Sequence, residues 1–279
     1  MTTIELGRAT ARTGLRRAFR QTMAVADMEI RRLLGRSGLP LALLAGSPLA
    51  IFIPWALLGS GPAAELAASG EHAVVFAGLF HGFLLRLILF FGCVAIFSNA
   101  FRREILDQTL HYALLVPIRR EALVLGKYIA GVAWGAVAFG IMVGVSLTLF
   151  YAPMGAQLLT LQTVSDGLTY VAVAVMAVIG YGALFLAVGL YVRNPIVPAV
   201  ITLAWESASF ILPPILQKMT VIYYLQQLSP VPVPDSPFAI PAEPTPAYIA
   251  VPGLLIVSAA LLAVAARKLR CIEINYGPD

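Results

Sequence analysis

The polar residues best suited to chemistry gather in one short part of a very apolar chain. Eight charged side chains fall between residues 102 and 127: Arg102, Arg103, Glu104, Asp107, Arg119, Arg120, Glu121 and Lys127. Long apolar runs flank this segment on both sides. Its charges either meet a partner outside the membrane or serve only to orient the chain across it. The segment is therefore the first candidate for a functional site.

This segment holds the only Gly-Lys pair of the sequence, Gly126–Lys127, which invites comparison with a phosphate-binding loop. Glu121 stands where that loop requires its first Gly, and Tyr128 stands where it requires Ser or Thr. The sequence also lacks the G-x-S-x-G, H-E-x-x-H and Asp-rich patterns of hydrolases and diphosphate enzymes. We therefore expect no ATP site and no cofactor in this chain, and no enzyme activity of its own.

Histidines and cysteines give no support for a metal site. His72, His81 and His111 are scattered, and none has another His or Cys at the spacing of metal ligands. Cys93 lies in an apolar run and Cys271 in the basic tail, so a disulfide framework is not indicated either.

The composition is that of an integral membrane protein. The chain has 279 residues, of which 59% are hydrophobic and 12% are charged, with a mean hydropathy of +0.86. A soluble domain carries about 25% charged residues, so this chain could not cover a globular surface with ionic groups. Its net charge of +5 is spread unevenly and does not indicate a nucleic-acid partner.

Uninterrupted apolar runs predict six membrane-spanning helices, because a span needs roughly 20 apolar residues and only helices satisfy their own backbone in lipid. The runs are Leu39–Gly59, Ala73–Ala100, Tyr128–Ala152, Gly167–Val192, Pro195–Gln217 and Ala247–Ala266. The expected fold class is an all-α integral membrane protein with a basic leader (1–38), a six-helix domain (39–266) and a short tail (267–279).

Lysine and arginine positions orient these spans. The leader carries eight Arg, the segment 101–127 five basic residues and the tail three, whereas the segments 60–72 and 153–166 have none. Basic and non-basic connections thus alternate, which predicts that both termini and the segment 101–127 are cytoplasmic. The leader is too long and too rich in Arg for a cleaved signal.

The long external segment, residues 218–246, has two parts. Its start, "KMTVIYYLQQL", is amphipathic enough for an interfacial or re-entrant helix, with Tyr223 and Tyr224 suited to the headgroup level. The Pro-rich remainder should be extended. An inert linker is an equally open alternative.

Small residues in the third run predict close helix packing. Gly131 and Gly135, and again Gly140 and Gly144, stand four residues apart, which lets two backbones approach in lipid. We expect this packing within the subunit rather than between subunits.

Two charges fall near the middle of predicted spans. Arg86 lies in the second run and Glu206 in the fifth, where a charge costs about 2.5–3.5 kcal/mol on insertion scales. Their matching depth predicts an ion pair, within a subunit or across a dimer. The pair either fixes helix packing or lines a translocation path, with His81 about one turn further out.

The local pattern of the charged segment predicts two helices. Apolar residues at helical spacing favour an amphipathic helix over Glu104–Val116, which Pro117 should end. A second short helix over Arg119–Gly126 would then lead into the third span. Together they would form a stiff elbow on the cytoplasmic face.

The same residues carry a family resemblance. The pattern "E-x-x-D-Q-T-L-x-Y-x-L-L-x-P-I-x-R-x-x-x-x-x-G-K-Y", residues 104–128, resembles the first cytoplasmic loop of ABC-2 type transporter permeases. Gln108 replaces the usual Gly, and Arg119 stands where Ser is common. The six-span plan, the basic leader and the long last external segment extend the resemblance over the chain.

The resemblance implies that this loop is a coupling helix that docks on a separate ATP-binding subunit. The residues that it assigns to the coupling loop are Glu104, Asp107, Thr109, Leu110, Tyr112, Leu114, Pro117, Arg120, Gly126 and Lys127. It also implies that the leader is an elbow helix at the membrane surface, with its apolar face formed by Phe19, Met23, Ala26, Ile30 and Leu34.

The assembly implied by the resemblance is an exporter in a bacterial or archaeal cytoplasmic membrane. Two permease subunits, identical or different, would pair with two ATPase subunits that hold ATP and Mg²⁺. The alternative is a membrane transporter not driven by ATP, or an assembly or scaffold subunit that uses the loop only for docking. The substrate is not readable from the sequence.

Overall fold

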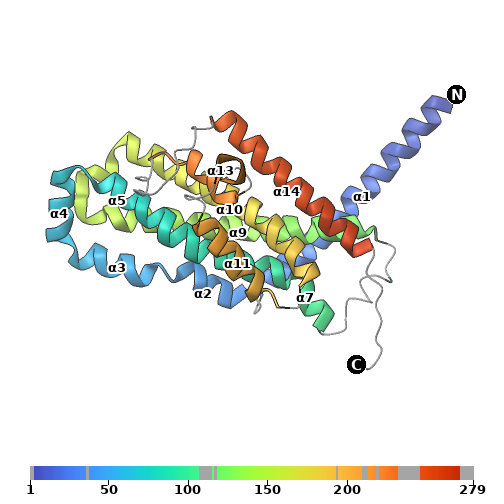
Figure 1. Ribbon diagram of the computed structural model, residues 1–279, viewed down its shortest axis with the longest axis horizontal. Helices are drawn as coiled ribbons and strands as arrows, with labels where there is room; N and C mark the ends of the chain where they lie inside the picture. Colours follow the sequence, from blue (N-terminus) through green and yellow to red (C-terminus); the bar gives the residue numbers. More distant parts are fainter. Residues whose placement is uncertain are drawn as a thin grey trace.

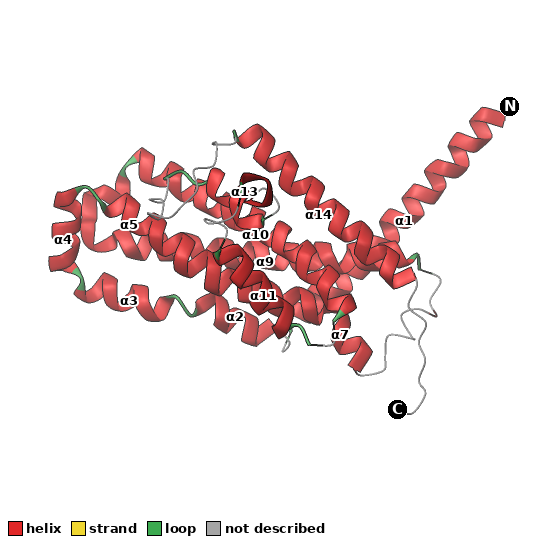
Figure 2. Cartoon of the chain, in the orientation of Figure 1, coloured by secondary structure: helices red, strands yellow, loops and turns green. Residues whose placement is uncertain are grey.

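The structure, a computed structural model, describes most of the chain as an elongated bundle of helices (Figure 1). The residues that it describes are 3–35, 38–106, 115, 118–192, 194–208, 213–217, 220–231 and 246–270. Within these ranges every regular element is helical and there is no strand (Figure 2). For this part of the chain, the expected all-α class is confirmed.

The helices follow one another with short connections. The first half contains α1 (Thr3–Leu34), α2 (Leu39–Gly46), α3 (Leu49–Leu58), α4 (Ser60–Ser69), α5 (His72–Leu79), the π-helix η2 (Phe80–Leu89), α6 (Phe90–Cys93), the π-helix η3 (Val94–Ser98) and α7 (Asn99–Leu106). The second half contains α9 (Arg120–Tyr151), the 3₁₀-helix η4 (Ala152–Leu159), α10 (Leu161–Tyr191), α11 (Ile196–Ser207), α12 (Pro214–Gln217), α13 (Val221–Gln227) and α14 (Ala247–Arg270).

Five helical segments of the described chain are long and apolar enough to cross a membrane. They are Leu39–Leu58, His72–Arg102, Arg120–Gly155, Leu161–Tyr191 and Ala247–Arg270. Each contains most of a predicted apolar run. The first is bent between α2 and α3 at Ser47–Pro48, because proline cannot donate the backbone bond that would continue the helix. The chain is a multi-pass helical membrane protein.

The predicted fifth span differs from this pattern. Helix α11 has 12 residues and ends at Ser207, which is too short for a bilayer core of about 30 Å. The run then continues through the short helix α12. A sixth full-length span is therefore not confirmed.

The predicted helix at the start of the external segment is present as α13, but its surroundings differ from those expected. Helix α13 packs against α10 and α14, and its residues Val221, Ile222, Tyr223 and Leu225 are buried. Tyr223 thus lies within the bundle instead of facing lipid headgroups. The arrangement is that of a re-entrant element that fills the bundle beside the short α11.

Helices α9 and α10 form the centre of the bundle, and small residues let the second span approach them. The Phe97 ring of η3 sits between Gly131 and Gly182, where an added Cβ would come within 2.5 and 2.6 Å of it. A Cβ on Gly135 would lie 2.9 Å from Val178. The predicted close packing within the subunit is therefore confirmed for the first pair, whereas a Cβ on Gly144 would meet open space.

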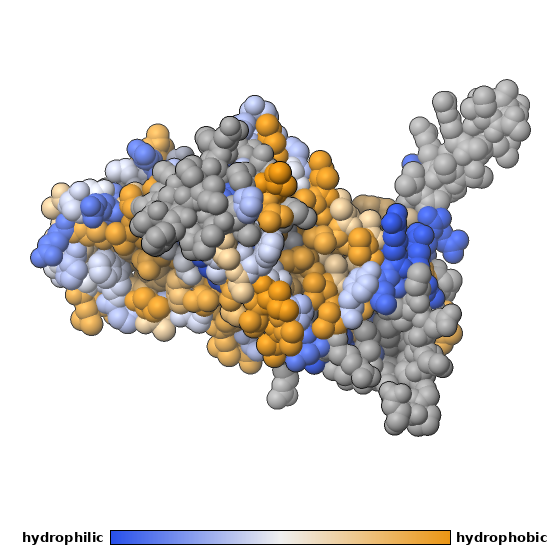
Figure 3. All heavy atoms as spheres, in the orientation of Figure 1, coloured by the Kyte–Doolittle hydropathy of each residue, from blue (hydrophilic) through white to orange (hydrophobic). Residues whose placement is uncertain are grey.

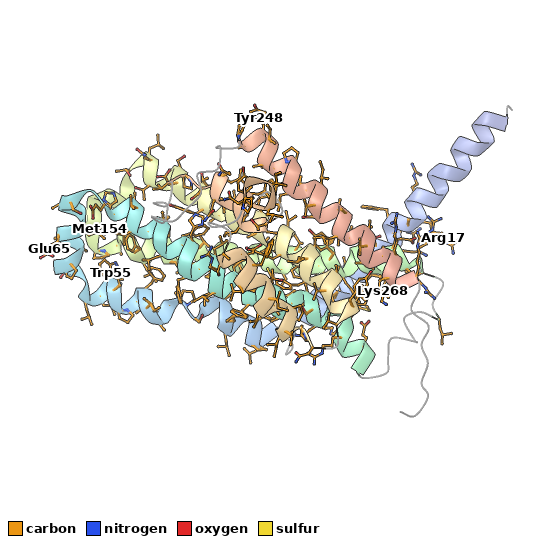
Figure 4. All side chains as sticks on the ribbon, in the orientation of Figure 1. Arg17, Trp55, Glu65, Met154, Tyr248 and Lys268 are labelled. Atoms are coloured by element: carbon orange, nitrogen blue, oxygen red, sulfur yellow. The ribbon has the colours of Figure 1, made fainter. Side chains whose placement is uncertain are left out.

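The two ends of the bundle differ in the residues that they carry. Helix α4 with Glu65 lies at one end, and Arg17 of α1 lies with Lys268 of α14 at the other (Figure 4). Hydrophilic residues gather at both ends in the space-filling view, with apolar residues between them (Figure 3). The basic leader and the basic end of α14 thus lie together, as the predicted orientation requires.

Candidate functional site

The charged segment is framed by the end of α7 and the start of α9. The predicted coupling-loop residues Asp107, Thr109, Leu110, Tyr112, Leu114 and Pro117 lie outside the described residues. Glu104, Arg120, Gly126 and Lys127 are described, and they form the base of the segment. The expected separate helix over Arg119–Gly126 is wrong, because α9 starts at Arg120 and runs without a break to Tyr151.

Lys127 is the centre of a buried group of charges. Its side chain is 0% exposed. The Nζ atom donates hydrogen bonds to Glu104 Oε1 at 2.6 Å, to the Ala100 carbonyl oxygen at 2.8 Å and to Glu29 Oε2 at 3.4 Å. These contacts use all three donors of the ammonium group. Lys127 therefore ties together helices α1, α7 and α9.

Arg32 of α1 completes this group. Its Nη1 atom lies 3.3 Å from Glu29 Oε1 and 3.7 Å from Glu104 Oε1. We refer to Glu29, Arg32, Glu104 and Lys127 as the ionic cluster. Two cations face two carboxylates, so the cluster is neutral overall, and each buried charge has an opposite charge beside it, as burial requires.

Gly126 places α1 close enough for these contacts. A Cβ at this position would lie 2.6 Å from Val25 Cβ and 2.8 Å from the Thr22 carbonyl oxygen. Thr22, Val25 and Glu29 stand at helical spacing and are buried, so this face of α1 lies on α9. The Gly-Lys pair thus serves α1 twice, by leaving space for its backbone and by binding its Glu29.

The rest of α1 presents an apolar surface to the outside. Of the predicted elbow residues, Phe19 and Leu34 are 64% and 72% exposed, and Met23 is also exposed. Ile30 is partly exposed. The predicted apolar face therefore points away from the bundle, except for Ala26, which is buried. Such a face is available to the membrane surface.

Arg120 holds the end of α14. Its Nη1 atom donates hydrogen bonds to the carbonyl oxygens of Leu269, at 2.9 Å, and Arg270, at 2.6 Å. The last four carbonyls of a helix have no partner within the helix and favour a cation. Glu121 pairs with the Arg270 side chain. The start of α9 is thus fixed to the last span by a cap and an ion pair.

The intramembrane charges do not form the predicted ion pair within one chain. Glu206 Oε2 accepts a hydrogen bond from the Tyr181 hydroxyl, and Oε1 accepts one from the Val221 amide at 3.0 Å. The carboxylate therefore joins the end of α11 to α10 and to the start of α13. Arg86 is close enough to act electrostatically on Glu206, but no ion pair within 4 Å joins these two described residues.

His81 is bound to the connection that follows α13. Its Nε2 atom lies 3.0 Å from Ser229 Oγ. The polar residues in the middle of the bundle thus come from the second predicted span, α10, α11 and the α13 region. The sequence pattern did not point to Tyr181 or Ser229, because a Tyr in an apolar run and a Ser in a Pro-rich segment are both unremarkable by composition.

A multi-pass bundle with a charged segment between its second and third spans defines the class of a membrane transport subunit. The model of the ABC-2 family transporter proteins matches residues 35–225, which is more than half of the chain, and the chain belongs to this family. Comparison with curated protein sequences finds no match. The matched region includes Arg86, Lys127 and Glu206, whereas Glu29 and Arg32 precede it.

Proposed function

We propose that this chain is the permease subunit of an ATP-binding-cassette exporter, driven by a separate ATPase subunit. Family membership supports the permease role, because ABC-2 permeases generally work with ATP-binding subunits. The observation that carries the proposal is the ionic cluster, which joins α1 to both helices that border the charged segment. A push on that segment would reach three helices at once.

The transmission follows from the stiffness of these connections. Helix α7 is the last part of the second candidate span, and α9 is the third. Lys127 holds them together through Glu104, and Arg120 holds α9 to the end of α14. A partner that closes on the segment would therefore move the ends of several spans together instead of bending a loop.

The assembly that we propose contains two permease subunits and two ATPase subunits in a bacterial or archaeal cytoplasmic membrane. ATP and Mg²⁺ would bind to the ATPase subunits, and both termini of this chain would be cytoplasmic. The exposed apolar residues of α1, led by Phe19 and Leu34, would lie on the inner membrane surface. The polar group of Arg86, His81 and Glu206 would border the path of the substrate.

Photo-cross-linking tests the docking of the ATPase. Leu115 lies inside the charged segment and is 77% exposed, and Leu58 at the far end of α3 is 81% exposed. A photoreactive phenylalanine placed at either position in the full chain probes the two ends of the bundle with equal access. We expect an ATP-binding protein to cross-link at 115 and not at 58. Equal cross-linking at both positions, or none at 115, would contradict the proposal and favour a transporter that works without ATP.

A further inference from the structure

Arg86 lacks the acceptor that a cation inside a membrane requires. It lies in η2, within the candidate span His72–Arg102. Its Nε atom is buried and has no hydrogen-bond partner, and no described residue forms an ion pair with its guanidinium. A guanidinium has five N–H donors and cannot lose its charge. An arginine in a span is therefore expected to bind an anionic group or to face a polar path.

The chain itself offers no free carboxylate at this depth. Glu206 already accepts hydrogen bonds from the Tyr181 hydroxyl and from a backbone amide. The five candidate spans carry two further carboxylates, Glu121 and Asp166, each within the first six residues of its span. A second copy of the chain could bring only the same groups from its spans, so the acceptor is best supplied by a ligand.

His81 presents a second open position on the same face of this helix. In a π-helix the backbone bond joins residues five apart, so His81 and Arg86 follow one another by one turn. His81 is 6% exposed, its Nε2 is bonded to Ser229, and its Nδ1 is buried without a partner. Wide π-turns occur frequently at functional sites. Two buried nitrogens thus point to one ligand that neither the chain nor its packing supplies.

We propose that Arg86, with His81 beside it, binds the anionic group of a lipophilic substrate. This inference rests on the proposed permease function and adds the class of substrate. A carboxylate or phosphate would accept two parallel hydrogen bonds from the guanidinium, which is the geometry that arginine binds best. The surrounding residues of the span, among them Leu85 and Leu89, are apolar and would contact the body of the amphiphile. His81 is a positioning residue that would contribute its Nδ1 atom.

The binding test uses the full chain in nanodiscs of zwitterionic lipid, without ATP and without the ATPase. The probe is a photoreactive long-chain fatty acid, and the matched probe is the corresponding alcohol. We expect the acid to label the wild type at least about tenfold more than the alcohol, as expected when one charge-assisted hydrogen bond is lost. Arg86→Gln should lose that preference, Arg86→Lys should keep part of it, and Arg17→Gln at the exposed end of α1 should keep all of it.

Several results would overturn the inference. One is equal labelling by acid and alcohol, and another is unchanged labelling in a folded Arg86→Gln protein. A third is a restored Tm in the exchanged variant Arg86→Glu/Glu206→Arg after its loss in Arg86→Glu, because this would show that the two residues pair with each other. Each variant is checked by gel filtration and Tm, and Arg86→Lys keeps the test valid if Arg86→Gln does not fold.

A second arm separates a transported substrate from a resident lipid. The chain is reconstituted with the ATPase captured at position 115, and the leaflet of the fatty-acid probe is followed with and without ATP. ATP-dependent movement that is lost in Arg86→Gln supports a substrate site. Specific binding without movement identifies a resident anionic lipid and overturns the substrate assignment, whereas failure of the proposed function is detected independently by the cross-link at 115.

Discussion

Replacing Lys127 by Met tests whether the ionic cluster holds α1 against the bundle. Methionine keeps an unbranched apolar stem but removes the charge and the three hydrogen bonds of Nζ. Glu29 and Glu104, whose side chains are 6% and 17% exposed, then share one cation, Arg32. Removing one partner of a buried ion pair destabilises a protein by about 3–5 kcal/mol, and we expect this loss here.

The measurement is the thermal midpoint Tm of the purified chain in nanodiscs, followed by tryptophan fluorescence. At about 2 °C per kcal/mol for a large domain, Lys127→Met should lower Tm by about 6–10 °C. The control is Arg31→Met on the same helix, whose ion pair with Asp27 is exposed and should be worth less than about 1 kcal/mol. If Lys127→Met and the control had the same Tm, the ionic cluster would not hold α1.

A rescue variant separates lost charge pairing from lost packing. Adding Glu29→Gln and Glu104→Gln to Lys127→Met removes the two carboxylates that the first substitution leaves uncompensated. Replacing all partners of a buried ion pair together is often neutral for stability, and Arg32, with a side chain that is 32% exposed, can still reach water. We therefore expect the triple variant to recover most of the lost Tm.

Three further substitutions test the other contacts of the bundle. Gly126→Ala should displace α1 and destabilise the chain by about 1–3 kcal/mol through overpacking, while Gly144→Ala, which meets open space, should be neutral in the same Tm assay. Arg120→Gln should expose the last turn of α14, measured as faster hydrogen exchange confined to that turn. Glu206→Gln should cost about 1.5–3 kcal/mol, because its amide cannot accept both hydrogen bonds of the carboxylate; an unchanged Tm would contradict that role.

The sequence predicts most of the membrane helices because the bilayer makes length and hydropathy decisive. The run that became α11 misled this reasoning, since hydropathy does not register where a helix stops within an apolar stretch. The pair Pro213–Pro214, in the middle of that run, is the signal that favours a break. A buried carboxylate at Glu206 that binds a backbone amide is a second sign of a helix that ends inside the bundle.

The base of the charged segment could be predicted only in part. Glu104, Gly126 and Lys127 stand out as polar or small residues between apolar runs. Their partner Glu29 does not, because a glutamate in a basic leader has the composition of a solvated surface. Its burial depends on the approach of α1 to α9, a tertiary contact that periodicity within α1 alone does not specify.

The central claim is that a separate ATPase docks on the charged segment of this chain and drives it. The most direct measurement is ATP hydrolysis by material that co-purifies with the tagged chain from its native membrane, compared between wild type, Asp107→Lys in the segment and Glu65→Lys at the opposite end. We predict activity with the wild type and Glu65→Lys and its loss with Asp107→Lys, all three chains being folded. Equal activity in all three, or none in any, would contradict the claim.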